Sequence, residues 1–132
     1  MRVFEFKTKL EDRTKSFSVA TFRVLDALPG KCSTSVIAYQ LGKSASSIGA
    51  NCREANRAES REDFAHKLQI ALKEASEACY WLEILSDLYP LHEAVKELLR
   101  ESAELRNLLQ SIARTVRIKS QPGAPNSNTP NS

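Results

Sequence analysis

The chain has few of the features that mark membrane, secreted or disulfide-rich proteins. Only four of its 132 residues are glycine and three are cysteine. No uninterrupted apolar run approaches the roughly 18 residues that a transmembrane helix needs. The start, MRVFEFKTK, lacks the apolar stretch of a secretory signal. We therefore expect a protein of the cytoplasm that does not enter the membrane.

The cysteines, at positions 32, 52 and 79, are too few and too scattered for a disulfide framework. Cys52 and Cys79 fall on apolar helical stripes, which is typical of reduced core thiols. A nucleophilic cysteine needs a base beside it, and the sequence places neither of the two histidines next to these thiols. The cysteines therefore give no support to an enzyme.

The net charge is only +3, but it is unevenly distributed. Residues 1–50 carry a balance of +4, residues 51–99 of −4, and residues 100–132 of +3. Such separation can bring a basic surface of one subunit to an acidic surface of another, or to phosphate. A solvated helical exterior with charges clustered by chance would look the same.

Apolar residues recur at helical spacing along four segments. Phe17, Thr21, Val24 and Leu28 mark the buried face of the first, and strict heptads mark the third and fourth. Pro29-Gly30 ends the first segment, Ser60-Arg61-Glu62-Asp63 resembles a capping box, and Tyr89-Pro90 ends the third. The predicted helices cover residues 10–28, 35–57, 61–88 and 91–118.

Four amphipathic helices with short links predict an all-α fold, an antiparallel up-down four-helix bundle over residues 10–118. Residues 1–9 are expected to form a short N-terminal arm. From residue 119 to residue 132 the chain has three prolines, one glycine and almost no apolar content. We expect this tail to be disordered, because it buries too little to offset its ordering entropy.

The second helix carries a ridge of small residues that includes Gly42, Ala45 and Gly49. Each mid-helix glycine costs about 1 kcal/mol relative to alanine, so close approach by another helix is the expected compensation. The third helix has an apolar surface, extended by Trp81, that is wider than one neighbour covers. These four residues are predicted to pack against other helices or other subunits.

Two polar groups near the end of the second helix are candidates for function. Asn51 and Glu54 are predicted to bond to the following link, or else to contact a ligand. The cations suited to straddle phosphates, and so predicted to bind nucleic acid, are Lys43, Arg53, Arg57 and Arg61. Interleaved Glu54, Glu59 and Glu62 offer ordinary ion pairing as the alternative.

Catalytic and metal-binding motifs are weak. Asp63-x-x-His66 is half of a di-iron bundle site, but His92 lacks a carboxylate three residues before it. Gly42 and Gly49 lie mid-helix, away from any phosphate-cradling turn. We predict no catalytic residues, no metal and no cofactor.

Three segments, LEDRTKSFSVATFRVLDALP, QLGKSASSIGANCREANRAES and DFAHKLQIALKEASEACYWLEIL, carry a family resemblance. They resemble the bacterial four-helix bundle protein family, also called the 23S rRNA intervening sequence protein family. The resemblance implies an up-down bundle that assembles into a cyclic homopentamer with a central channel. Some members lie within insertions in large-subunit ribosomal RNA genes.

The same resemblance extends to the accessory subunit of diversity-generating retroelements, which binds a reverse transcriptase and also nucleic acid. It therefore implies a non-enzymatic, homo-oligomeric scaffold or accessory protein that contacts RNA, DNA or a nucleic-acid enzyme. The modest net charge of this chain departs from a dedicated nucleic-acid binder. A protein-only adaptor with no affinity for nucleic acid is the alternative.

Overall fold

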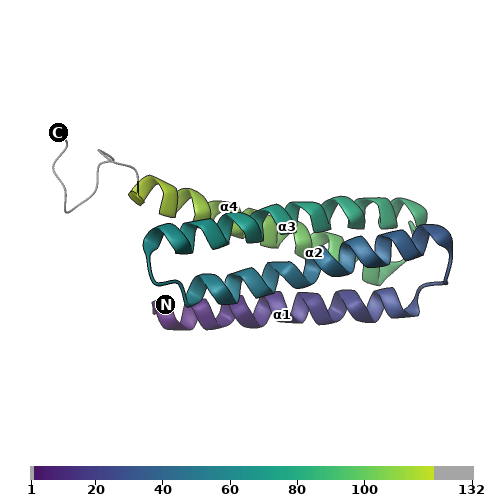
Figure 1. The fold of residues 1–132 in the computed structure, drawn as a ribbon. Coiled ribbons are helices and arrows are strands. Elements are labelled where there is room, and N and C mark those ends of the chain that lie inside the picture. Colours follow the sequence, from purple (N-terminus) through teal and green to yellow (C-terminus); the bar gives the residue numbers. More distant parts are fainter. Residues whose placement is uncertain (1, 121–132) are drawn as a thin grey trace.

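The computed structural model describes residues 2–120, which form four helices joined by short links (Figure 1). They are α1 (Val3–Ala27), α2 (Cys32–Asn56), α3 (Arg61–Leu88) and α4 (Glu93–Ser120). Consecutive helices run in opposite directions side by side, which confirms the predicted antiparallel four-helix bundle (Figure 1). Of the tail predicted to be disordered, residues 119 and 120 belong to α4, and the rest lies outside the described residues. None of the described helices is long and apolar enough to cross a membrane.

Side-chain hydrogen bonds fix where three of the helices begin. Ser60 Oγ accepts a hydrogen bond from the backbone N–H of Asp63 at 3.0 Å, so α3 begins where its cap predicted. Thr34 Oγ1 accepts one from the backbone N–H of Lys31 at 2.9 Å, and α2 therefore begins before the predicted residue 35. His92 Nδ1 accepts one from the N–H of Val95 at 3.3 Å, which explains why α4 begins at Glu93.

Helix α1 begins at Val3 rather than near Leu10, so the segment expected to be an arm forms its first turns. Contacts with the rest of the bundle hold these turns in place. Asn56 Nδ2 donates to the backbone carbonyl of Lys7 at 3.2 Å, and Lys7 Nζ lies 5.5 Å from the centre of the Phe64 ring. The local pattern of residues 1–9, in which Phe4 and Phe6 alternate with charged residues, does not reveal that Asn56 and Phe64 contact this segment.

The core runs the length of the bundle and follows the predicted heptads. Its largest fully buried side chains are Leu41, Ile48, Leu68, Leu82, Leu85, Val95, Leu105 and Leu109. Helix α3 packs closely against both α2 and α4. Helix α1 packs against α2 but touches α4 only sparsely. The seam between α1 and α4 is therefore the thinnest of the four seams.

Candidate interaction surfaces

The first candidate surface is a set of exposed apolar side chains on the adjacent helices α1 and α2. Val19 and Phe22 of α1 are 40% and 44% exposed, and Val36 and Tyr39 of α2 are 51% and 68% exposed. Single exposed apolar residues are normal, but four of them on two adjacent helices favour an interaction site. We call these four residues the α1–α2 patch.

The second candidate surface is a groove of about 310 Å³ along the thin seam between α1 and α4. Its floor contains Phe17 and Leu98, and both are buried. The whole α1–α4 groove is lined by Ser16, Phe17, Ala20, Val24, Ala94, Glu97, Leu98 and Glu101. Ser16, Ala20 and Ala94 have small side chains, which leaves the space above the buried Phe17 and Leu98 open.

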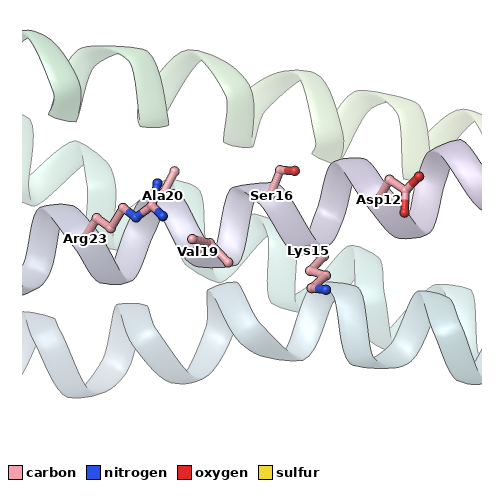
Figure 2. A pocket seen from close by; sticks show the side chains of 6 residues that line it. All are labelled: Asp12, Lys15, Ser16, Val19, Ala20 and Arg23. Carbon is pink, nitrogen blue, oxygen red and sulfur yellow. The ribbon is translucent and has the colours of Figure 1, made fainter.

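Figure 2 shows how α1 presents its side chains to both neighbouring helices. Ser16 and Ala20 lie on the side of α1 that faces α4, whereas Lys15 points toward α2 (Figure 2). Asp12 and Arg23 add opposite charges to the same exposed stretch of α1. These residues, together with Val19, line a separate hollow on the outside of α1. Because all of them come from one helix, this hollow is a shallow surface feature rather than an enclosed site.

One ion pair closes the α1–α4 seam beside the groove. The Arg13 guanidinium donates from Nε and Nη2 to the two carboxylate oxygens of Glu101, each at 2.8 Å, and Nη2 also reaches Glu104 at 3.1 Å. The hydrogen bond from Arg13 lowers the pKa of the Glu101 carboxyl, against the opposing effect of partial burial. Arg13 therefore holds α4 to α1 where apolar packing is sparse.

The predicted nucleic-acid residues do not form a free basic row. Arg53 Nε lies 3.2 Å and Arg57 Nη1 lies 3.7 Å from Oε1 of Glu11 on α1, so both guanidinium groups share one carboxylate. A hydrogen bond from Asn56, followed by the charges of Arg57 and Arg53, lowers the pKa of Glu11 while burial opposes the shift. Both arginine side chains stay more than half exposed.

Lys43 and Arg61, the other two predicted cations, are exposed at separate places. Lys43 lies midway along α2, and its charge acts on Glu74 of α3 without a close ion pair among the described residues. Arg61 lies at the start of α3 and, together with Lys7, lines a hollow of about 430 Å³ at the end of the bundle. The four predicted residues therefore do not converge on one point.

Asn51 and Glu54 bond within the helices rather than to the link that follows α2. Asn51 Nδ2 donates to the backbone carbonyl of Ser47 in the same helix at 2.8 Å. Glu54 forms an ion pair with Lys67 of α3 at 3.6 Å. The expected bonds to the link are absent from the part of the chain that the structure describes, and Glu54 instead joins α2 to α3.

The small ridge of α2 lies against α1 of the same chain. A methyl group on Gly42 would come within 3.0 Å of the Phe22 ring, and one on Gly49 within 3.2 Å of Thr14 Oγ1. Ala45 is fully buried, and its backbone carbonyl accepts a hydrogen bond from Ser18 Oγ at 3.0 Å.

Trp81 is partly buried against the core, and its ring and that of Tyr80 form a T-shaped pair with the ring centres 5.2 Å apart. Tyr80 itself is more than half exposed. The apolar surface that Trp81 extends on α3 is therefore only partly covered within the chain.

The groups weighed for metal or covalent chemistry lie apart. Among residues 2–120, no three His, Cys, Asp or Glu side chains gather closely enough to hold a metal ion. Burial, followed by the charge of Glu11, raises the pKa of the Cys52 thiol to about 12. Cys79 is buried as well, and its Sγ lies 3.2 Å from Ser102 Oγ in the core. Cys32 is exposed at the start of α2.

Sequence reasoning missed the two residues of α1 that organise these surfaces, Glu11 and Arg13. Each pairs with a residue far along the chain, so no local spacing could have identified the partner. The α1–α4 groove left a weak signal, since Ser16 and Ala20 lie four apart on the polar side of α1. Small residues on an exposed helical face are common, so this spacing alone does not predict a groove.

The four helices, their apolar core and their surfaces define an antiparallel four-helix bundle protein. The model of the family described as 23S rRNA-intervening sequence protein matches residues 7–111, and the chain belongs to that family. A crystal structure from Bacteroides thetaiotaomicron, described as a protein of unknown function from the S23 ribosomal protein family, has the same fold. It is 38% identical to this chain with a TM-score of 0.73, and the match covers 82% of this chain and 97% of that one. No curated protein matches significantly.

Proposed function

We propose that the protein is a non-enzymatic scaffold or accessory protein of the cytoplasm that works as an assembly of several identical copies. The observation that carries the proposal is the α1–α2 patch, whose apolar side chains stay 40–68% exposed within the chain. Burying such side chains between subunits is favourable by about 25 cal/mol per Å² of apolar surface. The resemblance to pentameric relatives supports a closed ring of five.

Light scattering of the purified protein should give several times the chain mass of 14.7 kDa. Tyr39→Glu should lower that mass, because it places a charge in the α1–α2 patch. Leu91→Glu, at an exposed apolar residue of the link between α3 and α4, is the matched control and should leave the mass unchanged. A wild-type monomer at micromolar concentration would overturn the proposal.

We further propose that the assembly binds RNA or DNA through Lys43, Arg53, Arg57 and Arg61, either directly or as the accessory of an enzyme such as a reverse transcriptase. The supporting observation is that Arg57 remains 67% exposed although it lies near Glu11, and Arg61 is exposed just beyond the same link. A ring repeats these cations, so several weak phosphate contacts add up.

Fluorescence anisotropy with single-stranded RNA and with duplex DNA, at 50 and 200 mM salt, tests this second proposal. Wild type should bind more weakly at the higher salt, and Arg53→Glu/Arg57→Glu should weaken binding and flatten the salt dependence. The matched control is Lys96→Glu/Arg100→Glu, at two exposed cations of α4. No binding by wild type at 50 mM salt, or an unaltered affinity in the first variant, would leave the protein-only adaptor as the better function.

A further inference from the structure

The α1–α4 groove and one exposed stripe of α2 both contain small residues and carry opposite charges. The stripe consists of exposed residues at alternating spacings of three and four, namely Val36, Tyr39, Lys43, Ser46 and Ala50. It combines small side chains, one large aromatic ring and one lysine. We call it the α2 stripe.

Small residues occur on both surfaces. Ser16 and Ala20 border the groove on α1, and Ala94 borders it on α4. Ser46 and Ala50 occupy the middle of the α2 stripe. The distance between packed helix axes depends on the side chains at the contact, so these small residues allow an added helix to approach the groove closely.

The charges of the two surfaces are opposite. Acidic residues line the α4 side of the groove, and Glu97 is exposed and makes no ion pair among the described residues. Lys43, in the α2 stripe, is an exposed cation that also lacks a close ion pair there. A contact between the two surfaces would pair these charges.

The two charges also lie at the same height along the bundle. Two contacts show which parts of α1 and α2 are level: Gly42 lies against Phe22, and Ser18 donates a hydrogen bond to the carbonyl of Ala45. Lys43 lies between Gly42 and Ala45, so it is level with residues 18–22 of α1. Ala20, in that stretch, lines the groove together with Glu97. Rotation about an axis parallel to the bundle preserves height. One copy would therefore bring its Lys43 to the level of Glu97 in the next.

We infer that the α2 stripe of one copy docks into the α1–α4 groove of the next, with Lys43 paired to Glu97 across the contact. The inference rests on the self-assembly proposed above and adds the faces that meet. Because the two surfaces differ and lie on different sides of the bundle, the contact is heterologous, and repeating it builds a ring where the rotation closes rather than a two-fold dimer. Lys43 then lies between subunits, so the docking narrows the phosphate contacts proposed above to Arg53, Arg57 and Arg61.

Charge exchange tests the docking. Lys43→Glu and Glu97→Lys should each lower the mass measured by light scattering toward 14.7 kDa, because each places like charges in the contact. The double variant Lys43→Glu/Glu97→Lys should restore the wild-type mass. Lys73→Glu, at an exposed lysine of α3 on neither surface, is the matched control and should leave the mass unchanged. Circular dichroism establishes that each variant is folded.

A cross-linking experiment tests the heterologous geometry without disturbing the charges. In a Cys32→Ser background, Ala20→Cys/Ser46→Cys should form a ladder of disulfide-linked multimers under mild oxidation, because each copy then links to two neighbours. Either cysteine alone should give no such ladder. The two buried native thiols, Cys52 and Cys79, stay out of this reaction.

The outcomes separate this inference from the proposed function. A wild-type monomer overturns self-assembly, and the docking with it. A wild-type assembly that survives both single charge reversals, or that gives no ladder from the double-cysteine variant, leaves self-assembly standing and overturns the assigned faces. Loss of assembly in both single variants, with recovery in the double variant, supports the docking.

Discussion

Replacing Phe17 with alanine should lower the free energy of unfolding by about 3–5 kcal/mol, the largest effect that we expect of a single substitution. The Phe17 side chain is 3% exposed and belongs to the core cluster. It also forms part of the floor of the α1–α4 groove, where the packing around it is already sparse. Its loss would leave a cavity at the seam that has the least other apolar contact. Urea denaturation followed by circular dichroism measures the change.

Phe22 is the matched control for Phe17, since it is the same residue type on the same helix. Its ring is 44% exposed, so Phe22→Ala should cost much less. Equal losses in the two variants would mean that Phe17 is not part of the packed core. The comparison is made at protein concentrations that give the same assembly state, because subunit contacts add to apparent stability.

Gly49→Leu should lower the free energy of unfolding by about 1–3 kcal/mol or more, although leucine favours helices better than glycine does. A Cβ atom at this position would lie 3.2 Å from Thr14 Oγ1 and 3.4 Å from the Thr14 carbonyl carbon. Thr14 is fully buried, and its hydroxyl donates to the carbonyl of Leu10 at 2.8 Å. The threonine cannot move aside without shifting α1. Thermal unfolding measures the loss.

Gly42 is the matched control for Gly49, because it belongs to the same ridge of small residues on α2 and also faces α1. A Cβ atom there would come within 3.0 Å of the Phe22 ring, the free end of a side chain that can turn toward solvent. Gly42→Leu should therefore cost less than Gly49→Leu. A melting temperature that is unchanged or raised in Gly49→Leu would show that this glycine does not limit the approach of α1.

The sequence predicted the fold well where local signals and apolar periodicity agreed. Helix α3 begins and ends as predicted, because Ser60 caps its start and Tyr89-Pro90 follows its last turn. The first turns of α1 were missed for a physical reason. Their helical form depends on contacts such as that of Lys7 with Phe64, and these contacts come from a part of the chain more than fifty residues away.

The interaction surfaces were less predictable than the fold. The heptads identified which residues face inward, but the partners of exposed charges depend on how the helices are set relative to one another. Arg53 and Arg57 were expected to face phosphate or nearby glutamates, and Glu11 of α1 lies beside both instead. The α1–α4 groove likewise exists only once the first and last helices are brought together.

The order of the helices in the bundle has a consequence for how the chain folds. Three of the four seams join helices that are neighbours in sequence, so most native contacts are local, and chains of this kind fold quickly. The seam between α1 and α4 is the exception, since the Arg13–Glu101 pair closes a loop of 88 residues. Closing so long a loop costs more entropy than closing any of the short links, and this seam offers the least packing in return. We therefore expect the seam that contains the groove to form last, and a neighbouring copy that docks there would then stabilise the final step of folding of the subunit that it joins.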